Sequence, residues 1–168
     1  MVAFHAIFAN PVYADWQYTS WGEKSEQVLA ASKGSLHRVR GAAIETAETI
    51  AANPPQVLPV GAVLRAKGAY RAGDLEFTAL LYFDSRSDKL EAVMLVLKSG
   101  AVKLDKMVAA LVAKYGSPYS DQTYRYGTRD RKWIGGGDMI QLDDIRAFGD
   151  TIASLTYHPI SKENQNGL

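Results

Sequence analysis

The chain has 168 residues, which suits one compact domain and leaves no room for separate catalytic and regulatory domains. Apolar residues make up 47% and charged residues 22%, a balance typical of a folded globular protein that excludes a disordered chain. The net charge of +1 excludes a strong overall attraction to nucleic acid or anionic membranes, and the lack of cysteine excludes disulfides, thiolate metal sites and a cysteine nucleophile.

The first fourteen residues carry no charged side chain and predict the end of a secretory signal peptide. Pro11 follows an apolar stretch, and Val12 and Ala14 are small residues at the two positions that signal peptidase reads. Cleavage after Ala14 predicts a mature domain over residues 15–160 in the periplasm or outside the cell. If residues 1–14 are retained, the same domain is cytoplasmic. The polar residues 161–168 predict a flexible tail.

The next segment combines aromatic residues with a short helix. Trp16, Tyr18 and Trp21 are expected to pin the N-terminus of the mature chain onto the fold. Residues 25–34 predict a helix that Ser25 caps and Gly34 ends. Residues 35–59 carry no readable pattern, apart from mixed helical character over residues 42–52.

Three alternating runs then predict strands at 62–71, 75–83 and 90–97, which form an antiparallel meander. The middle run is apolar on both faces near its centre, so we expect it inside the sheet.

A second helix is predicted over residues 103–115, where apolar side chains recur every three or four residues. Gly116 ends it and Pro118 prevents its continuation. Four shorter strands are expected after it, at 122–126, 131–134, 139–142 and 152–157, with a hairpin turn at Gly135-Gly136-Gly137-Asp138.

The order of a helix followed by a meander thus occurs twice. It predicts an α+β fold in which two repeats, over about 15–100 and 101–160, build an antiparallel sheet of about six strands. Each helix needs an apolar sheet face to cover, so both helices are expected on one face.

This order resembles two classes of small bacterial proteins, the β-lactamase-inhibitor-protein-like class and the small lipoproteins of the outer-membrane assembly machinery. The resemblance is carried by Trp21-Gly22 before Ser25-Glu26-Gln27-Val28, by Lys114-Tyr115-Gly116-Ser117-Pro118 at the end of the second helix, by Trp133, and by Leu155-Thr156-Tyr157. It implies tandem repeats, an exported location, and protein binding by a sheet surface without a cofactor. The chain departs from these families because it has neither a lipobox cysteine nor disulfides.

No catalytic or metal-binding motif is found. His5, His37 and His158 lie on three separate segments, and no pair has metal-ligand spacing. Asp138, Asp143, Asp144 and Asp150 form the nearest carboxylate cluster, which we interpret as solvated turn residues because adjacent residues of a strand point to opposite faces. We therefore predict no catalytic residue, no metal site and no cofactor.

One segment, from Tyr119 to Trp133, interleaves aromatic and cationic residues as many binding surfaces do. Its candidate binding residues are Tyr119, Tyr124, Arg125, Tyr126, Arg129, Arg131, Lys132 and Trp133. The opposite interpretation is structural, because strand alternation separates Arg125, Arg129 and Arg131 from Tyr124 and Tyr126. The tyrosines would then pack on the core and the arginines would be solvated.

The leading functional hypothesis is a non-enzymatic, exported bacterial domain that binds a protein or an envelope component through its sheet face and this segment. A cytosolic binder of nucleic acid or another anionic ligand is the first alternative. A hydrolase whose site is built from scattered residues is the second.

Overall fold

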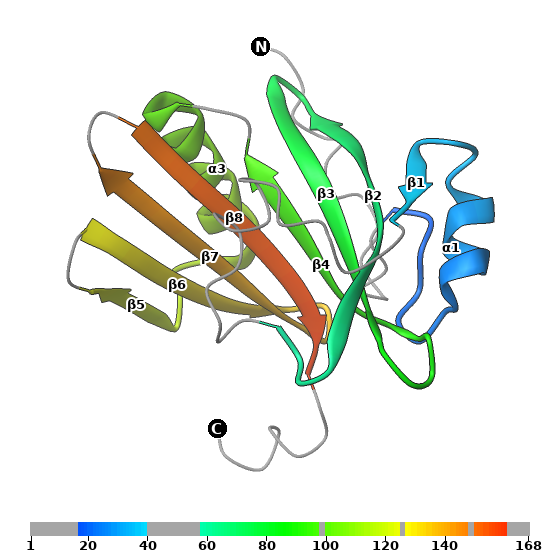
Figure 1. Cartoon of the computed structure of the whole chain (residues 1–168). Helices are drawn as coiled ribbons and strands as arrows, with labels where there is room; N and C mark the ends of the chain where they lie inside the picture. Colours follow the sequence, from blue (N-terminus) through cyan, green and yellow to red (C-terminus); the bar gives the residue numbers. More distant parts are fainter. Residues whose placement is uncertain (1–16, 40–57, 98–99, 125–126, 148–149, 161–168) are drawn as a thin grey trace.

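The computed structural model describes residues 17–39, 58–97, 100–124, 127–147 and 150–160 (Figure 1). The elements in chain order are α1 (Ser25–Ala31), β1 (Leu36–Arg38), β2 (Ala62–Ala72), β3 (Leu75–Asp84), β4 (Leu90–Leu97), α3 (Ala101–Tyr115), β5 (Ser120–Thr123), β6 (Thr128–Gly135), β7 (Asp138–Ala147) and β8 (Asp150–Pro159). The predicted signal-peptide residues 1–14, the predicted tail 161–168, the mixed-helical stretch 42–52 and Trp16 lie outside the described residues.

The strands form one antiparallel sheet in the order β1-β2-β3-β4-β8-β7-β6-β5. Each described helix is followed by four strands, and the two groups of strands meet where β4 pairs with β8. The predicted α+β fold with an antiparallel sheet is confirmed. β3 lies between β2 and β4, which explains why its sequence is apolar on both faces.

The number of strands was underestimated, because the sheet has eight rather than about six. β1 lies in the stretch without a readable pattern, and its three residues are too few to show alternation. Its edge position comes from antiparallel pairing with β2, where Leu36 lies opposite Gly68. β5 covers Ser120–Thr123 instead of 122–126, and it pairs only with β6 in the sheet.

The longer helix, α3, follows its prediction closely. It begins two residues earlier than expected and ends at Tyr115, and Gly116 follows with a φ of 81° that favours glycine. Leu104, Met107 and Leu111 are its buried residues. Neither described helix combines the length and apolar character needed to span a membrane.

Both helices pack on one face of the sheet, as predicted. Val28 of α1 and the buried residues of α3 belong to a single hydrophobic cluster with side chains from one face of the strands. The central strands and the β7–β8 pair contribute Phe77, Ala79, Leu81, Phe83, Val93, Leu95, Ile140, Leu142, Ala153 and Leu155. Figure 1 shows α3 behind β8 and β7, and α1 beside the β1 edge. We call this side the helix face, and the opposite side the second face.

The N-terminal aromatic residues pack onto the helix-face core. Tyr18 and Trp21 contact that cluster, and the Trp21 indole nitrogen donates a hydrogen bond of 2.8 Å to Asp138 Oδ1. Asp138 begins β7 after a two-residue hairpin turn in which Gly136 and Gly137 have φ values of 65° and 90°. The contact ties the start of the described chain to a hairpin more than a hundred residues later.

Candidate functional site

Strand alternation divides the side chains of β7 cleanly between the two faces. Ile140 and Leu142 enter the helix-face core, so Gln141, Asp143 and Ile145 point to the second face. The register extends this division to the neighbouring strands, because directly paired residues share a face.

Over β2–β4 the second face is a compact apolar cluster of Leu80, Tyr82, Ala92, Met94 and Val96, all of which are buried. Leu58, Ala62 and Leu64 pack against it. Burial raises the pKa of the Tyr82 hydroxyl to about 12. This half of the second face has the character of a core.

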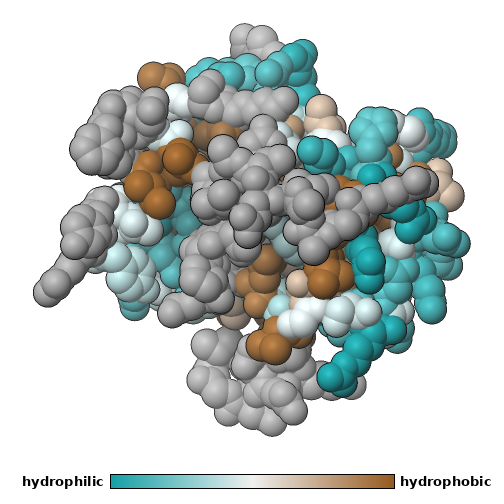
Figure 2. All heavy atoms as spheres, in the orientation of Figure 1, coloured by the Kyte–Doolittle hydropathy of each residue, from teal (hydrophilic) through white to brown (hydrophobic). Residues whose placement is uncertain are grey.

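Over β6–β8 the second face instead exposes large apolar side chains. Ile134, Ile145 and Ile152 are 40%, 36% and 40% exposed, and Ile145 lies directly opposite Ile152 in the β7–β8 ladder. Ile134 lies near the other end of β6, opposite Met139. We call these three residues the isoleucine face. Figure 2 shows apolar patches among polar residues on the side of the molecule seen in Figure 1.

Polar side chains lie between the two ends of the isoleucine face. Asp130 of β6 lies directly opposite Asp143 of β7, and one carboxylate oxygen of each is buried without a hydrogen-bond partner. Lys132 forms an ion pair of 3.3 Å with the other oxygen of Asp130. Gln141 donates a hydrogen bond of 3.2 Å to Asp143 Oδ1.

The Asp143 carboxyl is the most perturbed group of this cluster. Burial raises its pKa to about 6, the hydrogen bond from Gln141 opposes that shift, and the charge of Asp130 adds to it. A single lysine therefore stands beside two carboxylates, and the cluster favours a further positive charge or a proton.

The segment from Tyr119 to Trp133 does not form one surface. Trp133 is 1% exposed in the helix-face core, where its indole nitrogen donates a hydrogen bond of 2.9 Å to the Gly116 carbonyl. Arg131 is buried on the same face and forms an ion pair with the buried Asp144. The expectation of solvated arginines and of solvated turn aspartates is therefore wrong for Arg131 and Asp144, because each neutralises the other inside the fold.

The other described residues of the segment lie outside the helix-face core. Arg129 forms a two-bond ion pair with Asp121, at 2.7 and 2.6 Å, and Lys132 points to the second face. Tyr119 and Tyr124 are 50% and 52% exposed, so Tyr124 does not pack on the core as the structural interpretation expected. Arg125 and Tyr126 lie outside the described residues.

A groove of about 660 Å³ lies between α3 and β6. Val108 and Val112 line its apolar wall, and Arg129 and Arg131 line its polar wall. Arg129 is paired with Asp121 and Arg131 with Asp144, so neither arginine offers the groove an unpaired positive charge.

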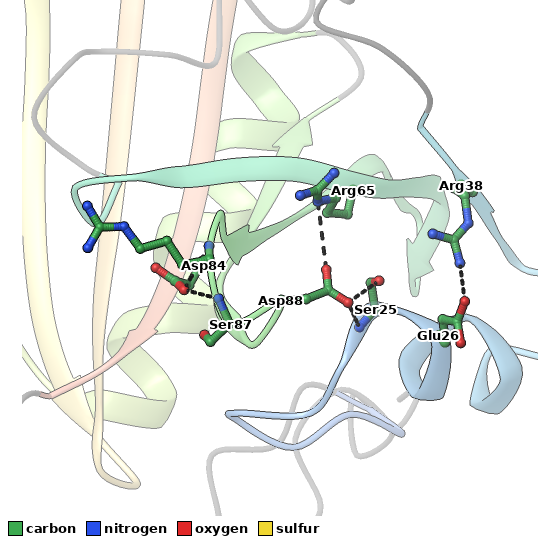
Figure 3. Close-up of polar contacts among 8 residues, drawn as sticks. Ser25, Glu26, Arg38, Arg65, Asp84, Ser87 and Asp88 are labelled. Atoms are coloured by element: carbon green, nitrogen blue, oxygen red, sulfur yellow. Dashed lines mark hydrogen bonds and ion pairs between the residues drawn. The ribbon is translucent and has the colours of Figure 1, made fainter.

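A second cleft, of about 480 Å³, lies where α1 meets β1, β2 and the β3–β4 turn (Figure 3). Asp88 of that turn accepts hydrogen bonds from the Ser25 backbone N–H at 3.2 Å and from its hydroxyl at 2.7 Å. Ser25 therefore does not cap α1 as predicted. The helix begins at Ser25 after the N-cap residue Lys24, whose backbone N–H donates a hydrogen bond of 2.9 Å to Gln27 Oε1. The acceptor for the Ser25 N–H comes from a strand turn 63 residues later.

Within the described ranges, no group of three or more His, Asp or Glu side chains could hold a metal ion. His37 is exposed on β1, whereas His158 lies on β8 with Nδ1 at 3.3 Å from the Pro159 carbonyl oxygen. Burial lowers the pKa of His158, which favours its neutral form.

The isoleucine face and the Asp130–Asp143 pair were missed by sequence reasoning. The signal that could have found them is the alternation of residues 139–145, which places Ile140 and Leu142 on one side and Gln141, Asp143 and Ile145 on the other.

Comparison with protein-family models, with curated proteins and with solved structures finds no match to this chain.

Proposed function

We propose that this chain is a binding domain that recognises a partner protein through the isoleucine face. The observation that carries the proposal is the position of Ile134, Ile145 and Ile152, three exposed apolar side chains on the sheet face opposite both described helices. Adjacent exposed apolar side chains bordered by polar groups, as at the Ile145–Ile152 pair, are typical of protein interfaces, which have an apolar core and a polar rim.

The polar centre of the same surface supports recognition by a protein rather than by nucleic acid. Asp130 and Asp143 place two carboxylates beside the single cation of Lys132. Phosphate backbones require an excess of Lys and Arg, which this surface does not offer.

The exported location belongs to the proposal as well. The repeated order of a helix followed by strands, and the pattern of residues 1–14, are the two observations that favour a duplicated, exported bacterial domain. The partner is then a protein or an envelope component outside the cytoplasm, and the binding role is non-enzymatic.

Site-specific photocrosslinking in the native cells tests the binding surface. A photoreactive amino acid is placed at Ile134, at Ile145 or at Ile152, and the same residue at Val102 of α3, which is 72% exposed, serves as the control. We expect an adduct of one discrete mass from the three isoleucine positions and none from Val102.

Two outcomes would contradict the proposal. One is the absence of any adduct from all three isoleucine positions in cells that contain the folded protein. The other is an adduct of the same mass and yield from Val102, which would show that crosslinking does not depend on the face.

A further inference from the structure

The cleft beside α1 has a cationic wall that the proposed protein-binding face does not use. Arg38 of β1 and Arg65 of β2 come from adjacent strands, and the Val39 N–H bonds to the Arg65 carbonyl at 2.8 Å. Both arginine side chains are 41% exposed and line the cleft together with Lys24. Figure 3 shows the Arg38 guanidinium directed toward Glu26 and the ion pair that joins Arg65 to Asp88.

Arg65 lies at an irregularity of β2. The register with β3 pairs Leu64 with Tyr82 and Ala66 with Leu81, so Arg65 is the extra residue of a β-bulge. A bulge breaks the alternation and redirects a side chain, and bulges are frequent next to binding sites. Arg65 has no partner residue in the β2–β3 ladder, and its side chain lines the cleft.

The Arg65 Nε atom is buried and makes no hydrogen bond. Asp88 Oδ1 lies 3.7 Å away, which is close enough for an ion pair but beyond hydrogen-bonding distance. Asp88 cannot approach freely, because its other oxygen is held by both donors of Ser25. A buried donor without an acceptor calls for an explanation such as a bound ion or water.

The charges of the cleft favour an anion. Lys24, Arg38 and Arg65 face two carboxylates, Asp88 and Glu26. Glu26 is 83% exposed and lies 3.4 Å from Arg38, so this ion pair contributes little and the carboxylate is free to move into solvent. Arg38 can then turn its planar set of donors to a ligand.

We propose that this cleft binds a small oxyanion, a phosphate or carboxylate group, between the guanidinium groups of Arg38 and Arg65. The first N–H of α1 takes no part, because Asp88 already accepts its hydrogen bond. Backbone contacts hold the segment before α1 against the start of β4: Lys24 and Lys89 form an isolated β-bridge, and the Leu90 N–H donates a hydrogen bond of 2.8 Å to the Glu23 carbonyl.

The test is a titration of the full isotope-labelled chain with inorganic phosphate, and separately with succinate, followed by the backbone amide signals of Ser25 and Asp88. Both ligands are added as sodium salts at constant ionic strength, with sodium chloride as the reference. We expect a saturable shift of these signals with phosphate, with succinate or with both, and the stronger of the two identifies the ligand chemistry.

Three variants make the result specific. Arg65→Gln and Arg38→Gln are each expected to weaken the apparent affinity at least tenfold. The matched control is Arg71→Gln on the same strand, because Arg71 is 70% exposed and pairs with Glu76 away from the cleft. It should bind like the original chain. The signals of β7 and β8 report in the same spectra that each variant is folded.

Shifts that rise linearly with both ligands, or that saturate equally in Arg65→Gln, Arg38→Gln and Arg71→Gln, would overturn the proposal. The result is independent of the isoleucine face. Substitutions at Ile145 and Ile152 should leave the titration unchanged.

Discussion

Neighbouring residues of β6 have opposite surroundings on the two faces of the sheet. On the helix face, Arg131 and Asp144 are both buried and their charges balance one to one. On the second face, Lys132 is 31% exposed and stands beside two carboxylates, one of which has its pKa raised by burial to about 6. At β6 the helix face balances its buried charge within the fold, whereas the second face over β6–β8 leaves an excess carboxylate and exposed apolar side chains.

The largest expected difference in stability is between substitutions of Trp133 and of its neighbour Ile134. Trp133→Ala removes a side chain that is 1% exposed, together with its hydrogen bond to Gly116, and should lower the free energy of unfolding by about 3–5 kcal/mol. Ile134→Ala removes a side chain that is 40% exposed and should cost about 1 kcal/mol or less. Urea denaturation of both variants measures the difference. Equal losses would contradict the division between the two faces.

The buried ion pair gives the next comparison. Asp144→Leu leaves Arg131 buried without its partner and should lower the free energy of unfolding by about 3 kcal/mol. The double variant Arg131→Met with Asp144→Leu should recover most of that loss, because no buried charge remains. Arg71→Met, which removes an exposed ion pair with Glu76, is the control, with an expected change below about 1 kcal/mol. A double variant no more stable than Asp144→Leu would be inconsistent with this account.

Asp143 makes stability depend on pH in a defined direction. Its folded-state pKa of about 6 lies above the usual value of 3.8, so the folded chain holds this proton more tightly than the unfolded chain. The carboxyl therefore costs no stability below about pH 4, and its destabilising effect grows as the pH rises to about 6.

Asp143→Asn removes that cost, so its stability advantage over the original chain should increase by up to about 3 kcal/mol between pH 4 and pH 7. Urea denaturation across this pH range measures the advantage, and Asp121→Asn serves as a control at an exposed ion pair. An advantage that stays constant, or that grows toward low pH, would contradict a raised pKa of Asp143 in the folded chain.

The smallest effect is expected at Arg129, two residues from Arg131 on the same strand. Its ion pair with Asp121 is 45% and 35% exposed on the two sides, so water screens it. Arg129→Ala should change the free energy of unfolding by about 0.2–1 kcal/mol, and less at high salt. Thermal denaturation at low and high salt measures the change. A loss of unfolding free energy as large as that of Asp144→Leu would contradict the view that the exposed Arg129 pair is weaker than the buried Arg131 pair.

Alternation and helical periodicity were sufficient to predict α3, the central meander and the hairpin at Gly136-Gly137, because each of these follows from contacts close in sequence. They could not predict β1, which owes its place to pairing with β2, or the acceptor for the first N–H of α1, which is the distant Asp88. The dispersal of the described residues of the candidate binding segment has the same cause. Composition shows that Arg131 and Trp133 are present, but only the register with β7 and the position of α3 show that they are buried.

The account depends most on the claim that the isoleucine face binds a partner while contributing little to stability. The decisive measurement is the photocrosslinking yield from position 134 in a chain that also carries Ile145→Lys and Ile152→Glu. The two opposite charges face each other across the β7–β8 ladder and preserve strand pairing. The account predicts that this chain unfolds within about 1 kcal/mol of the original and loses the crosslinked adduct. An adduct of unchanged yield in the folded double variant would contradict it.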